Sequence, residues 1–267
     1  MVSRLTDYRS IDHFALALER GIRNAVDKIE HQSTIALGPI VEAVSLAWTS
    51  REIAPFILKF DCQKLIQTIR TARKQPLKAR YGREGDRQWG FICFNESTAE
   101  VVREPLQGFQ LATRKAMLLP TSANQAKARI CGALQELVDN ILDHSGAPRT
   151  GIAGFLVSAQ HFELSVGDAG MGMLASLRSN PTFSYLTDAG SAMAVGLEEG
   201  NSRYGLQDRG FGFGTLFRAL NTLNAELRFR TGDYALEVAG RSPTLRNNRI
   251  SQKAVLQGFV ASVKLTL

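Results

Sequence analysis

The sequence is poor in cysteine and has no long apolar segment. Its three cysteines, Cys62, Cys93 and Cys131, are far apart in the chain, and none belongs to a CxxC pair. A scattered, odd-numbered set argues against the disulfide framework of small secreted domains and fits a reducing compartment. No uncharged apolar run approaches the roughly 18 residues that a membrane-spanning helix needs. We therefore expect a cytoplasmic protein with no membrane segment.

The composition is that of a globular protein with an excess of positive charge. Hydrophobic residues make up 44% of the 267, which suffices for one large domain or two modest ones. Much of the net charge of +7 lies between Arg70 and Arg87, where seven basic residues face only Glu84 and Asp86. The plainer interpretation of this run is a solvated helix end and loop. The other is a contact with nucleic acid or with an acidic partner surface.

The first part of the chain reads as a small mixed α/β unit without a chemical motif. Apolar spacing predicts a helix over residues 11–30 and another over 61–73, and short strands over 57–60 and 89–94. We place a domain boundary between residues 95 and 120, which gives an N-terminal unit of unknown role over 1–116. Its function is not legible from the residues.

The second part, residues 117–267, predicts a larger α/β domain. A long helix is expected over about 122–144, because Pro120 and Thr121 offer a helix start and Gly146 a stop. Strands are expected over 151–158 and 161–167, an irregular stretch over 173–209, a helix over 215–224, and strands over 225–231, 234–240 and 259–266. This order predicts an α/β (α+β) fold, a two-layer sandwich with helices on one face of a mixed sheet.

The first motif lies near the end of the long predicted helix. At about 100° per residue, Leu137, Val138 and Ile141 share one side, and the other side gathers three carboxylates, an amide and an imidazole, from Glu136, Asp139, Asn140, Asp143 and His144. Clustered carboxylates repel one another, and a hard cation such as Mg²⁺, carried by a nucleotide, would relieve the repulsion. The alternative is an amphipathic helix with an acidic solvent face.

The second motif is an Asp-x-Gly-x-Gly at the end of a predicted strand. Asp168 at such a place can accept a hydrogen bond from the amine of adenine and would select against guanine, which presents a carbonyl there. Gly170 and Gly172 remove Cβ atoms where a ligand would approach the backbone. The alternative is a tight turn between two elements.

The third motif is a glycine-rich loop before a predicted helix. Gly210, Gly212 and Gly214 alternate with phenylalanine and lead into Thr215 and an apolar helical run. Such a loop leaves backbone N–H groups and the positive end of the helix dipole facing outward, which suits phosphate, and Arg209 adds a positive charge. The alternative is a hinge. The intervening stretch, 173–209, has the length of a lid or binding loop.

Taken in this order, the three motifs resemble those of the GHKL superfamily, the histidine-kinase-like ATPases with a Bergerat-type ATP-binding domain. Residues 136–140 resemble its N-box, 168–172 its G1 box and 210–214 its G2 box. The continuation from Asn140 to His144 is more similar to the anti-sigma-factor serine kinases than to the other branches. The resemblance covers roughly residues 117–267 and explains nothing before them.

The resemblance implies a site for ATP and Mg²⁺. It makes Asn140 a Mg²⁺ ligand and Glu136 the group that orients and activates the attacking water or hydroxyl. Asp168 would bind adenine, with Gly170 and Gly172 beside the base. Further residues are implied around the nucleotide: Asp139 and Asp143 at the edge of the pocket, and Arg209, Gly210, Gly212, Gly214 and Thr215 over the phosphates.

Three functions stay open at this point. The first is an enzyme that hydrolyses ATP or transfers its phosphoryl group to a partner protein, as a serine/threonine kinase does. The second is a nucleotide-gated switch in which ATP orders residues 173–209 and alters a docking surface, with little turnover. The third is a nucleic-acid-associated ATPase that uses residues 70–87. We expect a protein partner, leave a homodimer open, and regard nucleic acid as the least favoured partner.

Overall fold

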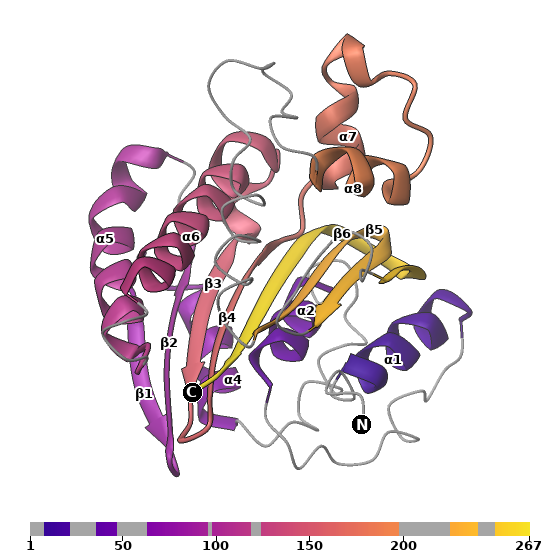
Figure 1. The fold of residues 1–267 in the computed structure, drawn as a ribbon. Helices are drawn as coiled ribbons and strands as arrows, with labels where there is room; N and C mark the ends of the chain where they lie inside the picture. Colours follow the sequence, from indigo (N-terminus) through magenta and orange to yellow (C-terminus); the bar gives the residue numbers. More distant parts are fainter. Residues whose placement is uncertain are drawn as a thin grey trace.

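The fold is a central sheet of six strands with helices on both of its faces (Figure 1). The computed structural model describes residues 8–21, 36–46, 63–95, 98–118, 124–197, 225–239 and 249–267. The strands are β1 (Arg80–Glu84), β2 (Arg87–Cys93), β3 (Ile152–Val157), β4 (His161–Asp168), β5 (Ala225–Ala239) and β6 (Arg249–Thr266), in the order β1-β2-β3-β4-β6-β5. The expected α/β class, with helices packed on a sheet, is confirmed.

Every pairing between the described strands is antiparallel, whereas the sequence predicted a mixed sheet. The connections explain two of these five pairings. Two residues join β1 to β2 and three join β3 to β4, and such short connections allow only antiparallel neighbours, since a parallel pair needs a crossover of a dozen or more residues.

Two hydrophobic cores lie on opposite faces of this sheet. On one face pack α5 (Ala99–Ala116) and α6 (Asn124–His144), against strand residues such as Phe155 and Leu227. On the other pack α1 (Arg9–Glu19), α2 (Leu37–Leu46) and α4 (Gln63–Ala72), against residues such as Phe91 and Val260. The expectation of helices on one face alone is therefore corrected, because the first 72 residues supply the second helical layer.

The two parts of the sequence divided near residue 117 contribute strands to the same sheet. β2 pairs with β3 over six residues, with Phe91 opposite Gly154. The zone in which the boundary was expected holds α5, which buries Val102, Leu106 and Phe109 in the core beside α6. The N-terminal residues thus complete the sheet and cover its second face.

Buried charge joins the N-terminal helices to β5. Arg228 is almost fully buried and its Nε donates to Glu42 Oε1 on α2 at 2.7 Å, while its Nη2 lies 2.5 Å from Asp12 Oδ1 on α1. Glu237 on β5 is a third partner of Arg228. Burial pushes the pKa of Asp12 upward, but the charge of Arg228 and the hydrogen bond from Lys253 outweigh burial and hold this pKa below its ordinary value. Each of these buried charges therefore has an opposite charge beside it, which offsets the cost of removing it from water.

Residues 172–197, expected to be irregular up to position 209, fold into two helices. α7 (Gly172–Arg178) and α8 (Ala189–Leu197) flank a short 3-10 turn, Pro181–Phe183, and enclose a small core of their own that includes Leu177 and Phe183. Asp188 caps α8, because its Oδ1 accepts the N–H of Ser191 at 2.9 Å. The two helices lie beyond one end of the sheet (Figure 1).

Other expectations are met with small differences. The long helix, β3 and β4 begin and end within about two residues of their predicted bounds. The strands predicted over 225–231 and 234–240 form one strand, β5, with an irregularity between Thr231 and Tyr234. The strand predicted over 57–60 and the helix predicted over 215–224 lie outside the described residues. No helix in the described ranges is long and apolar enough to cross a membrane.

Candidate nucleotide site

Helix α6 separates its apolar and polar residues as the sequence predicts. Ile130, Leu134, Val138 and Ile141 are fully buried in the core against the sheet. Glu136, Asp139 and Asn140 are half-buried and Asp143 is exposed. The polar residues of the first motif therefore lie on the side of the helix that is not packed on the sheet.

Asp139 is connected through Gln135 to the adjacent helix. Its Oδ1 accepts a hydrogen bond from Gln135 Nε2 at 2.8 Å, and Gln135 Oε1 accepts one from Gln110 Nε2 of α5 at 2.6 Å. This chain of amides directs the Asp139 carboxylate along the α5 side of α6. Asp139 is thus fixed in orientation by residues that no sequence motif indicated.

The end of α6 and the turn after β4 are hydrogen-bonded to each other. The backbone N–H of Met171 donates to the carbonyl oxygen of Ser145 at 2.8 Å. A Cβ on Gly170 would lie 2.2 Å from that same carbonyl oxygen, so only glycine fits there. Gly146, with φ of +69°, turns the chain away from the helix. The structure therefore brings the first and second motifs together at one end of the sheet (Figure 1).

Asp168 is the last residue of β4, and its carboxyl group is buried. The residue is 1% exposed, and its Oδ1 accepts the backbone N–H of Gly170 at 2.6 Å. Its Oδ2 is also buried, and none of the described residues donates a hydrogen bond to it. Burial raises the pKa of Asp168 to about 7, although the Gly170 hydrogen bond opposes the shift. A buried carboxyl oxygen thus has no hydrogen-bond donor among the described residues.

The backbone of strand β6 lies directly beside this carboxyl group. Gly258 has φ of +81°, and a Cβ there would lie 2.3 Å from the carbonyl oxygen of Asp168 and 2.6 Å from its Oδ1. Gly172, with φ of +73°, approaches the same strand: its Cβ would lie 3.0 Å from Gly258 O. Glycine at these positions lets β4, β6 and the start of α7 meet around Asp168.

Two threonines fix the turn that carries the second motif. Thr231 on β5 accepts the N–H of Met173 at 3.0 Å and donates its hydroxyl proton to Gly258 O at 2.9 Å. Thr150 accepts the N–H of Ala169 at 2.9 Å. Sequence reasoning missed Thr231, Thr150 and Gly258. The available signal was Gly258, directly before the strand predicted over 259–266. A glycine at a strand is typical of a close approach between two backbones.

The remaining predicted residues divide between described and undescribed parts of the chain. Arg209, Gly210, Gly212, Gly214 and Thr215 lie outside the described residues. Across the described ranges, no group of three or more His, Cys, Asp or Glu side chains is arranged to hold a metal ion. The carboxylates of α6 therefore do not form a metal site by themselves, and a cation there would need oxygen ligands from another source, such as the phosphates of a nucleotide.

The basic run from Arg70 to Arg87 is divided by the sheet. Arg73 donates to the carbonyl oxygen of Val44 at 3.2 Å, and burial lowers the pKa of Arg73 to about 10. Arg80 donates to Gln75 Oε1 at 2.9 Å and shares the α4 face of the sheet with Phe91, its cross-strand partner. Arg83, an odd number of residues away, projects from the opposite face. The run therefore does not form one continuous phosphate-binding track.

Comparison with protein-family models finds none that matches this chain, and comparison with curated proteins finds no match either.

Proposed function

We propose that this protein binds ATP, with its magnesium ion, at the end of the sheet where α6, the turn after β4 and strand β6 meet. The observation that carries the proposal is the Asp168 carboxyl group, which is 1% exposed and has a buried Oδ2 to which no described residue donates. A buried polar atom without a protein partner is costly unless a ligand or water supplies the missing hydrogen bond. The amine of adenine is a donor of the required kind.

The glycines around Asp168 fix the position of its carboxyl group. Gly170 and Gly258 allow the protein's own backbone to pack directly against Asp168, and Gly172 lets the start of α7 approach β6. In the proposed complex the edge of the purine comes within hydrogen-bond distance of the carboxylate that is held in this way. An ionised Asp168 accepts from the amine of adenine and repels the carbonyl oxygen of guanine, so the site would discriminate between the two bases.

The polar side of α6 supports a role in chemistry at the phosphates. In the proposed complex Asn140 is a magnesium ligand, and the bound cation neutralises charge on the phosphates. Glu136, one turn earlier on the same side, accepts the proton of the attacking water or hydroxyl group. In the proposed complex Asp143 lies at the edge of the site, and Asp139 is held by the hydrogen bond from Gln135 of the same helix. The reaction is ATP hydrolysis or phosphoryl transfer to a protein.

A nucleotide-gated switch is the second candidate, and the helices α7 and α8 favour it. This pair begins at Gly172, within the second motif, and its first turn is attached to β5 through the Met173–Thr231 hydrogen bond of 3.0 Å. A ligand against Asp168 would touch the start of α7, so that binding could alter the position of both helices without turnover.

Calorimetric titration with Mg-ATP and with Mg-GTP tests the proposal, on the wild type and on Asp168→Asn. Asp86→Asn, the same chemical change at an exposed turn between β1 and β2, is the matched control. We expect the wild type and the control to prefer ATP by about tenfold or more, and Asp168→Asn to lose that preference, since a hydrogen bond to a charged group contributes roughly 1.5–3 kcal/mol. Negligible heat with both nucleotides would refute nucleotide binding here.

A further inference from the structure

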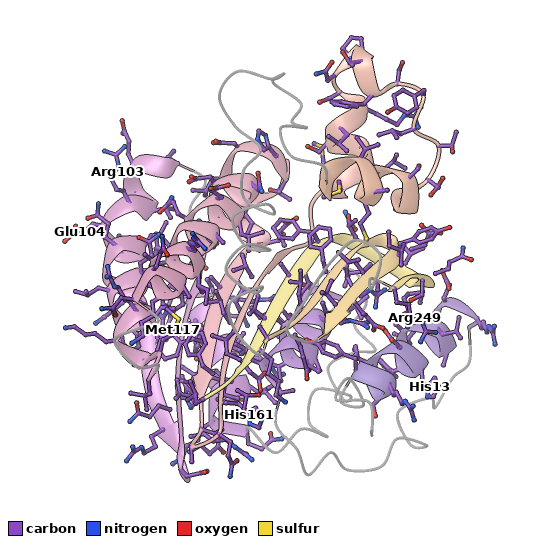
Figure 2. All side chains as sticks on the ribbon, in the orientation of Figure 1. His13, Arg103, Glu104, Met117, His161 and Arg249 are labelled. Carbon is purple, nitrogen blue, oxygen red and sulfur yellow. The ribbon has the colours of Figure 1, made fainter. Side chains whose placement is uncertain are left out.

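The outward face of α5 carries exposed aliphatic residues among polar ones. Its inward side buries Val102, Leu106 and Phe109 in the core with α6. On the outward side Val101, Glu104, Gly108, Leu111 and Lys115 are exposed and are spaced alternately by three and four residues, so they lie along one face of the helix. Leu118 is exposed just past the end of α5. Figure 2 shows Arg103 and Glu104 projecting outward from the same helix.

Large aliphatic side chains on this face are open to solvent. Leu111 is 55% exposed and Leu118 is 70% exposed, and Val101, nearly three turns before Leu111, is similarly open. Single exposed apolar residues are ordinary, but several on one helix and the residues directly after it are typical of a surface that another molecule covers. We call the face formed by Val101, Leu111, Leu118 and their neighbours the α5 surface.

Strand β1 extends the α5 surface at the edge of the sheet. Tyr81 is half exposed, and its hydroxyl lies 3.5 Å from the carbonyl oxygen of Gly108 on α5. Its ring packs near Phe155, with centroids 6.3 Å apart. A Cβ on Gly108 would meet nothing within 4 Å, so the helix is open beside the tyrosine. Tyr81 and the outward side of α5 thus lie next to each other at the edge of the sheet.

The charge near the C-terminal end of α5 is positive. Arg114 and Lys115 are exposed in the last turn of α5, and Arg83 is exposed on β1, two residues from Tyr81 and on the same side of the strand. Between residues 105 and 118 the sequence contains no aspartate or glutamate. A partner that covers Leu111 and Leu118 would therefore place its own carboxylates near these three cations.

We propose that the α5 surface docks an amphipathic helix of a partner protein, with an apolar stripe at spacings of three and four residues and carboxylates along its borders. The aliphatic residues favour a protein over nucleic acid, because Leu111, Leu118 and Val101 gain nothing from contact with phosphates, whereas a helix buries them. The three cations favour an acidic partner and determine the orientation in which it binds.

This surface is separate from the proposed nucleotide site. Gln110 of α5 donates to Gln135 of α6 at 2.6 Å, and Gln135 donates to Asp139, so α5 packs beside the helix that carries the proposed nucleotide residues. The α5 surface is formed by other residues, on the outward side of α5 and on β1, and it shares no side chain with the proposed nucleotide site. The docking proposal goes beyond the proposed function and does not depend on it.

The test uses a labelled synthetic helix of about 20 residues, with leucines spaced by three and four residues and glutamates beside them, and a twin in which lysine replaces each glutamate. Fluorescence anisotropy with the full chain measures both affinities. We expect saturable binding of the glutamate peptide, about tenfold tighter than that of the lysine twin. Leu111→Ser weakens it by about tenfold, and the double variant Arg114→Glu, Lys115→Glu reverses the preference between the peptides.

Lys74→Glu and Arg178→Glu, which reverse exposed cations elsewhere, are the controls and leave the affinity within about twofold. Circular dichroism verifies that Leu111→Ser is folded. Absence of saturable binding, or wild-type affinity in Leu111→Ser, would overturn the proposal. The proposal would also be overturned if a single-stranded oligonucleotide displaced the peptide and bound Leu111→Ser as tightly as the wild type. That result would indicate a surface for polyanions. A wild-type dimer that Leu111→Ser dissociates would assign the surface to a second copy of the chain.

Discussion

Gly258 of β6 and Asp168 of β4 are in such close contact that a single methyl group on the glycine would lie 2.3 Å from the carbonyl oxygen of the aspartate. The register of the two strands imposes this contact, since Asp168 is paired with Phe259, the residue after Gly258. The carboxyl group of Asp168 lies within the same contact, because the same Cβ would also be 2.6 Å from its Oδ1. Stability and ligand binding therefore depend on the same glycine.

Gly258→Ala is expected to lower the free energy of unfolding by roughly 3 kcal/mol or more, from the left-handed backbone and the steric overlap together. Gly85→Ala is the matched control: Gly85 also has positive φ, +62°, but a Cβ there meets nothing within 4 Å. The control should lose only about 1–2 kcal/mol. Urea denaturation of both variants measures the difference in the free energy of unfolding. Equal losses in the two variants would show that Gly258 is not in close steric contact with Asp168.

The pKa of Asp168 makes stability depend on pH. Burial raises this pKa from its ordinary value of 3.8 to about 7, so that between these values the folded protein binds a proton that the unfolded chain does not. The stabilisation is fully present below about pH 4 and is lost as the pH rises through 7. Asp168→Asn, which resembles the protonated acid, should therefore gain stability relative to the wild type on going from about pH 4 to pH 8, by roughly 4 kcal/mol.

Denaturation of both proteins at several pH values measures this difference. A constant difference between wild type and variant across the range would mean that Asp168 is ionised throughout, in contradiction to its burial.

Arg228 is expected to be the most sensitive of the buried charges. It bonds to Glu42, which is fully buried, and to Asp12 on α1. Arg228→Ala leaves the Glu42 carboxylate without its main partner in a dry environment, which costs about 3–5 kcal/mol. Lys264→Ala, which removes the more exposed pair with Glu163, should cost less than about 1 kcal/mol.

Hydrogen exchange adds a local readout to the Arg228 variant. Because Arg228 attaches both α1 and α2 to β5, we expect faster exchange in α1 in Arg228→Ala than in the wild type. Unchanged exchange in α1, with an unfolding free energy like that of Lys264→Ala, would show that the ion pairs do not hold the N-terminal helices on the sheet.

Glu136 distinguishes the enzyme from the switch. If the protein turns over ATP, Glu136→Ala should lower the rate by about a hundredfold or more while nucleotide affinity stays within a few fold, because the carboxylate acts on the reacting proton and not on the base. Glu100→Ala, an exposed glutamate on α5, is the control and should keep full activity. Phosphate release and calorimetry give the two quantities; wild-type turnover in Glu136→Ala would remove this residue from the chemistry.

The elements that sequence reasoning found are those with a one-sided apolar pattern. α6 alternates core residues such as Ile130 and Ile141 with polar ones, so its bounds and its buried side were both predictable. α2 was missed because all ten of its residues are buried, including Glu42, and a helix buried on all sides has no amphipathic pattern. Its only charge is neutralised by Arg228, 186 residues later, a pairing that no local pattern contains.

The candidate site was predictable only where it is local in sequence. Asp168 and Gly170 belong to one short motif at a strand end, and the structure gives that motif a buried carboxyl group. Thr231 and Gly258 come from strands β5 and β6, and their place beside Asp168 follows from the pairing of β4 with β6, which the sequence does not specify. Register sets these contacts, and register depends on the whole sheet.

The most direct test of the central claim compares the affinities of Mg-ATP and its inosine analogue, which differ mainly in having an amine or a carbonyl at position 6 of the purine. With Asp168 ionised, at about pH 8, the wild type should bind ATP roughly 10- to 100-fold more tightly, and Asp168→Asn should bind both within about threefold, since an amide can serve as donor or acceptor. Equal affinities in the wild type would contradict the assignment of Asp168 as the residue that binds adenine.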